Sequence, residues 1–198
     1  MTLPGIITDV RKDETASKVK KFYNIINNAL LFSIAEHGDV SGWMGTPANL
    51  NYNENLEFLQ TYFMPYIKYT RFDNCYEEAV CIYMADGGMF AFRYDMQGGD
   101  ILFFVNGKFD NNRRNVFAFQ FNKNNGVTVD GMPIDRPNNR TIIEPYVYEW
   151  DGTYDSLIND PRRGCSKARE NTSTVRLGTF CAKLLQINDW KFTDDFPW

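Results

Sequence analysis

The sequence is poor in the residues that most catalytic and metal-binding motifs need. It has one histidine, His37, among 198 residues, and its four cysteines include no C-x-x-C pair. A zinc site would need four thiolates at unusual spacings. A catalytic His37 would need a nucleophile or a carboxylate aimed at it, and the chain carries no nucleophile motif. These absences argue against an enzyme.

Long stretches of a single character are also missing. No window of 18 or more residues is apolar throughout, so the sequence predicts no membrane span. The net charge is −4 and there is no long basic run, which argues against nucleic-acid binding. The opening MTLPGIITDVRKDE is too short and too polar for a signal peptide. Without internal repeats, we expect one domain over residues 1–198.

The cysteines fit two disulfides of an exported protein better than a metal site. Four cysteines allow three pairings, and closeness in the sequence favours Cys75–Cys81 and Cys165–Cys181. In a straight strand Cys75 and Cys81 would lie roughly 20 Å apart. Their pairing therefore requires a turn between them and stays open, whereas we expect the pairing of Cys165 with Cys181.

A long helix is predicted over residues 9–37, which lack glycine and proline and are followed by Gly38. At 100° per residue, one apolar stripe contains Phe22, Tyr23, Ile26, Leu30, Ile34 and His37. His37 there is expected to interact with the helix dipole. Ile25 and Phe32 lie together well off the stripe. They are either tolerated surface residues or a second packing surface against neighbouring subunits.

The remaining pattern predicts helices followed by antiparallel strands. A short second helix within residues 53–69 is interrupted at Pro65, and Asp86-Gly87-Gly88 joins two apolar runs as a hairpin. Further strands are expected at 100–107 and 115–122, a short strand at 126–129, and a last helix at 179–187. This order predicts an α+β fold with helices on one face of an antiparallel sheet.

The loop between residues 106 and 115 is the one place that suggests a cofactor. Asn106, Asp110 and Asn112 offer oxygen ligands to calcium. However, Asp110 is the only carboxylate there, and three neighbouring basic residues repel a cation. Asn and Asp are also good turn formers. We expect no cofactor, with calcium at this loop as the alternative.

Other candidate sites have simpler explanations. The carboxylate pairs Glu77/Glu78 and Asp194/Asp195 are adjacent in sequence, so their side chains point to different sides and make poor acid–base pairs. Residues 171–173 match the N-glycosylation triplet. Aromatic residues reach 16%, which indicates core packing first and a carbohydrate-binding face second.

Three stretches resemble the type IV pilins and type II secretion pseudopilins. TLPGIITDVRKDETASKVKKFYNIINNALL is similar to the segment directly after the hydrophobic N-terminal part of such prepilins. ILFFVNGKFDNNRRNVFAFQF is similar to their strand, VNG, Asn-rich loop and strand unit, and CAKLLQINDWKFTDDFPW to their cysteine-plus-tryptophan ending. The cleavage motif, the early glutamate and the apolar segment of that family are absent. We therefore expect a truncation, or alternatively a natural soluble homologue.

The resemblance implies a pilin-like α+β fold, in which a long N-terminal helix packs on an antiparallel sheet beside a C-terminal disulfide-closed loop. Cys165–Cys181 would close that loop, and Trp190, Phe196 and Trp198 would pack it down. It also implies a structural subunit, not an enzyme, of a homo-oligomeric or mixed extracytoplasmic filament. The missing segment would be the inner-membrane anchor.

The surroundings of such a subunit are implied by the same resemblance. It would stand in a filament at the cell surface or in the periplasm, and the truncated chain alone is expected to be a monomer without nucleic-acid partners. The alternative function is a minor pilin or surface adhesin that acts as a carbohydrate- or protein-binding module.

Overall fold

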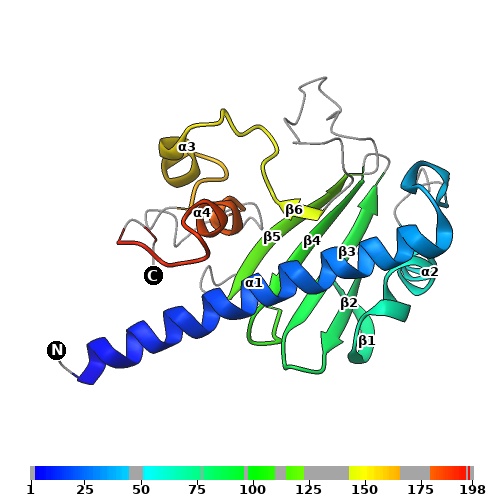
Figure 1. Ribbon diagram of the computed structural model, residues 1–198, viewed down its shortest axis with the longest axis horizontal. Coiled ribbons are helices and arrows are strands. Elements are labelled where there is room, and N and C mark those ends of the chain that lie inside the picture. The colour runs from blue at the N-terminus through cyan, green and yellow to red at the C-terminus, as the bar shows by residue number, and fades with distance from the viewer. Residues whose placement is uncertain are drawn as a thin grey trace.

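One 35-residue helix, α1 (Leu3–His37), crosses a face of a six-stranded antiparallel sheet (Figure 1). This computed structural model describes residues 3–44, 51–76, 78–95, 98–109, 115–122, 143–165, 179–194 and 196. The other elements are η1 (Val40–Gly42), α2 (Tyr52–Tyr62), η2 (Met64–Tyr66), β1 (Tyr69–Tyr76), β2 (Ala79–Met84), β3 (Met89–Asp95), β4 (Gly98–Phe104), β5 (Val116–Asn122), β6 (Ile143–Pro145), α3 (Tyr154–Asn159) and α4 (Cys181–Ile187).

The sheet is a meander in which each strand pairs with the next, in the order β1-β2-β3-β4-β5-β6. The predicted α+β class and the antiparallel strands are confirmed. The hairpin at Asp86-Gly87-Gly88 joins β2 to β3, and Gly87 has the positive φ of 87° that the turn requires. Strand β5 alternates as expected, with Phe117, Phe119 and Phe121 in the main core under α1, while Ala118 and Gln120 on the other face are also buried.

The end of α1 agrees with the predicted signal. Gly38 has φ 77° and its N–H donates to the carbonyl of Ile34 at 2.9 Å, which satisfies one of the last carbonyls of the helix. The helix begins at Leu3 rather than at residue 9. Its 35 residues extend over about 52 Å at 1.5 Å per residue, and its N-terminal end projects beyond the sheet (Figure 1).

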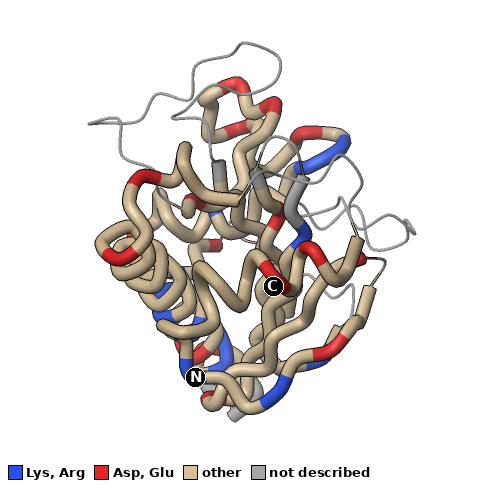
Figure 2. Tube along the Cα trace, turned by 90° about the vertical axis from the view of Figure 1, so that its right-hand side faces the viewer, with Lys and Arg blue, Asp and Glu red and all other residues tan. Residues whose placement is uncertain are grey.

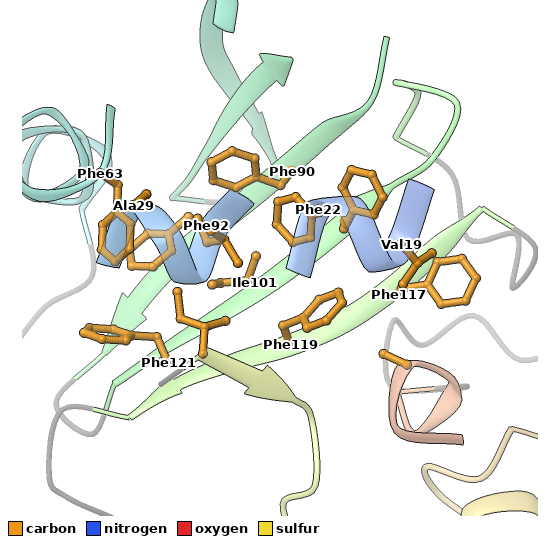
Figure 3. Close-up of a cluster of buried hydrophobic side chains, with 14 of the residues drawn as sticks. Val19, Phe22, Ala29, Phe63, Phe90, Phe92, Ile101, Phe117, Phe119 and Phe121 are labelled. Carbon is orange, nitrogen blue, oxygen red and sulfur yellow. The ribbon is translucent and has the colours of Figure 1, made fainter. Parts of the chain in front are cut away.

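The core forms between α1 and a face of phenylalanines (Figure 3). The Phe22 ring stacks on Phe103 with centroids 4.2 Å apart, and it lies 5.4 Å from both Phe90 and Phe119. The other buried residues of α1 from Val19 to its C-terminal end are Val19, Ile26, Ala29, Leu30 and Ser33. Interlocked rings of this size contribute beyond their buried area, so this contact sets the position of α1.

Helix α2 covers the part of the same face near the C-terminal end of α1 (Figure 1). Its Phe58 stacks on Phe92 at 5.7 Å, and Tyr62 stacks on Trp43 at 4.2 Å. The Tyr62 hydroxyl also accepts a hydrogen bond from the Met44 N–H. The segment after α1 is thereby fixed on the core.

Two polar contacts tie α1 to the sheet. The Asn27 amide donates to the Ile143 carbonyl and accepts from the Ile143 N–H, both at 2.9 Å. It therefore acts as a strand partner for β6. Lys21 forms an ion pair with Asp86 in the β2–β3 turn at 2.7 Å.

The aromatic C-terminal segment packs on the domain. Trp190 lies 5.2 Å from Tyr23 of α1, and Phe196 is 3% exposed with its ring 4.4 Å from Phe192. Trp198 lies outside the described residues. Buried aromatic side chains each contribute roughly 1.5–3 kcal/mol, enough to hold a segment that would otherwise fray.

Ile25 and Phe32, which were predicted as a second packing surface, differ in their exposure. Ile25 is half-buried and packs against the main core, because it neighbours the buried Phe22 and Ala29 on the helix surface. Phe32 differs: it is 62% exposed, with its ring 6.2 Å from Tyr66. Of the two, Phe32 is the more exposed.

Three elements were not expected: β1, β6 and α3. Strand β1 is an edge strand of mixed polar character, and β6 has only three residues. Helix α3 has six residues, and its N-cap is Thr153, whose side chain accepts from the Ser156 N–H. The last helix, predicted at 179–187, is α4, and the strand predicted at 126–129 lies outside the described residues.

The described residues contain no helix long and apolar enough to cross a membrane. Basic and acidic residues are interspersed along the chain trace (Figure 2).

We predict that Phe22→Ala lowers the free energy of unfolding by about 3–5 kcal/mol, because it removes a fully buried ring from the contact with Phe103. Phe32→Ala, on the same helix, should change it by less than about 0.5 kcal/mol. Denaturant unfolding of both variants measures this. Equal losses of unfolding free energy in the two variants would mean that Phe22 is not the main contact between α1 and the sheet.

Candidate functional site

A cleft of about 620 Å³ opens on the sheet face opposite α1. Its floor includes Ala91, Leu102 and Ala118, which are register neighbours on β3, β4 and β5. The lining residues that the structure describes are Tyr76, Ala79, Ala91, Arg93, Asp100, Leu102, Ala118, Phe119, Tyr146, Tyr148, Glu149, Arg162, Arg163 and Thr179. The small side chains of Ala91 and Ala118 leave space above the sheet.

The strand alternation that buries phenylalanines under α1 also makes this floor. Successive side chains of a strand point to opposite faces, so Ala118 lies between the inward Phe117 and Phe119. Arg93 and Asp100 are register partners on the same outer face. The cleft is therefore a direct consequence of how the sheet is covered on its other side.

The segment after β6 forms one wall. The Tyr146 N–H donates to the Ala118 carbonyl at 3.0 Å, and the Val147 N–H donates to Oε1 of Gln120 at 3.2 Å. Glu149 then adopts φ 59°, a left-handed conformation that is uncommon for a residue other than glycine. These contacts hold Tyr146, Tyr148 and Glu149 beside the floor.

Glu149 joins two arginines. Its Oε2 accepts from Nη2 of Arg162 at 2.8 Å and from Nη1 of Arg163. Arg163 is only 8% exposed, and its guanidinium carbon lies 4.8 Å from the Tyr148 ring centroid. Burial alone lowers the pKa of Arg163, but the hydrogen bond to Glu149 and the attraction of Tyr146 and Glu149 raise it above its ordinary value. Arg163 is thus a fixed positive charge.

Tyr146 is kept neutral in this environment. Burial and the negative charge of Asp100 raise its pKa to about 12, while the charge and the hydrogen bond of Arg163 act in the opposite direction. Its hydroxyl therefore keeps its proton at physiological pH and serves as a hydrogen-bonding group rather than as a base.

The sequence DPRRGC explains the position of the arginines. Oδ1 of Asp160 accepts from the N–H groups of Arg162 and Arg163 at 2.8 and 2.7 Å, a local turn typical of aspartate. A Cβ at Gly164 would lie 2.5 Å from the Ile158 carbonyl oxygen. Only glycine fits between Arg163 and Cys165.

Both disulfides that closeness favoured are present. Cys165 pairs with Cys181, with Cα atoms 4.9 Å apart. Phe180, next to that bond, donates its N–H to the Arg163 carbonyl at 3.2 Å. The disulfide thus holds the chain two residues after Arg163, and the Phe180 hydrogen bond holds the Arg163 backbone itself.

Cys75 pairs with Cys81 across the β1–β2 hairpin, with Cα atoms 5.8 Å apart. The hairpin supplies the turn that this pairing required. Tyr76 and Ala79, which lie in the same hairpin, line the cleft.

Of the three calcium candidates, only Asn106 is among the described residues. Oδ1 of Asn106 accepts from the Lys108 N–H at 2.9 Å, which is a turn contact, while Asp110 and Asn112 lie outside the described residues. Asp73, Cys75 and Cys81 have ligand atoms within 4.8 Å of one another. Both sulfurs are in the disulfide, so they offer no thiolate to a metal.

The other predicted residues have local structural contacts. His37 ends α1 with its ring 5.2 Å from Tyr62 in an edge-on arrangement. Oε2 of Glu78 accepts from the Tyr52 N–H at 2.9 Å, at the start of α2. Glu77, Asp195 and residues 171–173 lie outside the described residues.

None of the charged residues of the cleft was predicted from the sequence. Two local signals were available: an arginine pair shortly before Cys165, and the alternating YVYE that ends at Glu149. Neither indicated that the two segments meet.

The protein is an α+β domain with a cleft on one sheet face and two disulfides. The disulfides indicate an oxidising, extracytoplasmic compartment. The chain belongs to a family of unknown function (DUF6613), which matches residues 5–198. No curated protein and no solved structure is significantly similar to the chain.

We predict unequal stability losses when the disulfides are removed. The cysteines of Cys165–Cys181 are 16 residues apart and those of Cys75–Cys81 are 6 residues apart. By chain entropy, paired alanine substitutions should cost about 3 and about 2 kcal/mol respectively. Denaturant unfolding measures both. A larger loss for Cys75–Cys81 would contradict the role of the C-terminal bond as the main covalent constraint.

Proposed function

We propose that the protein is a pilin-like or pseudopilin-like structural subunit of an extracytoplasmic filament, and that it catalyses no reaction. The observation that carries this proposal is the division of α1 into two parts. The side chains of α1 that are buried on the domain all lie between Thr15 and Ser33 in the part of the helix whose burial is described, whereas the N-terminal turns project beyond the sheet (Figure 1).

The projecting part of α1 carries apolar side chains that the domain covers only partly. Ile7 is 47% exposed and Val10 is 51% exposed. Most helical stability in proteins comes from tertiary packing of an apolar face. In a filament, helices of neighbouring subunits would cover Ile7 and Val10, which supports assembly through this end of α1.

A second exposed apolar pair lies near the other end of the same helix. Leu31 is 57% exposed and Phe32 is 62% exposed. Single exposed apolar residues are common on monomers. In a filament, however, other helices would surround α1, and Leu31 and Phe32 would then pack against them. Phe32 is therefore still the predicted subunit contact, without Ile25.

The C-terminal part, held by its disulfide, fits the same environment. Two disulfides suit an oxidising compartment, and we place the subunit at the cell surface or in the periplasm. The similarity of three sequence stretches to pilins supports the same function, and the long helix on an antiparallel sheet agrees with it.

The test compares filament assembly with folding for one double variant. In cells that express the gene, sheared surface material should contain filaments labelled by antibody to this chain. Val10→Ser with Phe32→Ser should reduce filament yield several-fold. The purified variant should lose less than about 0.5 kcal/mol of unfolding free energy per site, because both side chains are exposed.

Asn24→Ser with Asn28→Ser is the matched control, since both asparagines are exposed polar residues of α1. This control should leave filament yield unchanged. The proposal would be contradicted if the sheared material contained no filaments labelled by the antibody. It would also be contradicted if neither double variant changed the filament yield.

A further inference from the structure

The cleft opposite α1 is more polar than an ordinary small-molecule pocket. Nine of the fourteen lining residues that the structure describes carry a polar side-chain group, whereas ligand pockets are mostly apolar with a few polar groups. An apolar ligand would remove water from these groups without replacing its hydrogen bonds, at a cost in free energy. A ligand rich in hydroxyl groups would replace them.

The lining also has a local excess of positive charge. Among the described lining residues there are three basic ones, Arg93, Arg162 and Arg163, and two acidic ones, Asp100 and Glu149, an excess of one positive charge, although the whole chain carries −4. One carboxylate, Glu149, is shared by two guanidinium groups. The cleft therefore favours a ligand with one negative group over a neutral or cationic ligand.

Arg162 is placed to meet such a group. Its side chain is 66% exposed, and Glu149 contacts it at Nη2. A guanidinium has five N–H donors and binds a carboxylate in a bidentate way. The Arg162 N–H is held by Asp160 and its Nη2 by Glu149, which reduces the ordering that Arg162 undergoes on binding.

The aromatic wall suits the body of a sugar. The rings of Tyr146 and Tyr148 lie 6.4 Å apart, above a floor that includes Ala91 and Ala118. Tyrosine combines an apolar ring with a polar hydroxyl. Such a ring packs against the C–H face of a pyranose, while hydroxyl and carboxylate groups nearby bind its hydroxyls.

We propose that this cleft binds a carboxylated sugar at the end of a glycan, with the sugar carboxylate on Arg162 and its hydroxyls on Asp100 and Tyr146. The cleft volume of about 620 Å³ lies within the range of pockets for small ligands. This inference does not depend on filament assembly, so either proposal can fail alone.

Calorimetric titration of the whole chain at low salt tests the ligand class. The probes are N-acetylneuraminic acid and glucuronic acid, with methyl glucoside as the neutral sugar and benzoate as the acid without hydroxyls. At least one acidic sugar should bind about tenfold more tightly than both comparison compounds. Equal or tighter binding of methyl glucoside or benzoate would overturn the proposal, as would no binding of either acidic sugar at millimolar concentration.

Variants then test the location. Arg162→Gln should raise the dissociation constant about tenfold, because it removes the charged bidentate contact. The matched control is Arg71→Gln, since Arg71 is also an exposed arginine in an ion pair and lies outside the cleft lining. It should leave binding unchanged.

Ala118→Leu fills the floor without changing charge and should abolish binding, with thermal unfolding confirming that the variant is folded. Unchanged binding in both Arg162→Gln and Ala118→Leu would place the ligand elsewhere and overturn the proposal.

Discussion

The packing of the Phe22 ring on Phe103 decides where α1 crosses the sheet. Because strand side chains alternate between faces, the packing of α1 and α2 on one phenylalanine face leaves the other face to a smaller apolar cluster around Met89 and Phe104 and to the side chains of the cleft. Ala91, Ala118 and Asp100 are on that outer face. The core and the cleft thus lie on the two faces of the same sheet.

The C-terminal part of the chain connects the two faces. From β6, which Asn27 holds by two hydrogen bonds, the chain passes to the outer face and brings its charged residues to the cleft.

Covalent, hydrogen-bonding and ionic contacts together fix the charged end of the cleft. Glu149 lies beside Arg162 and Arg163, and the Cys165–Cys181 bond holds the chain directly after them. Arg163 is therefore constrained from several directions at once. Such an arrangement favours a defined site over an adaptable surface.

Local signals carried most of the successful predictions. Gly38 ends α1, Gly87 forms the β2–β3 turn, and the alternation of side chains decides which residues of β5 face the core. Each of these signals acts within a few residues of the chain. The failures involve contacts between distant residues, such as Asn27 with Ile143 across 116 positions. The cleft was not predictable for the same reason, since the Glu149–Arg163 pair depends on an uncommon backbone conformation and a distant turn, neither of which has a periodic pattern.

The division of α1 into an anchored part and a projecting part is tested most directly by amide hydrogen exchange along the helix. Amides between Val19 and Ser33 should exchange only through global unfolding, since their side chains include the core contacts. Amides between Ile7 and Glu14 should exchange much faster, through local fraying. Equal protection along the whole of α1 would contradict this division, because it would mean that the domain itself stabilises the projecting turns.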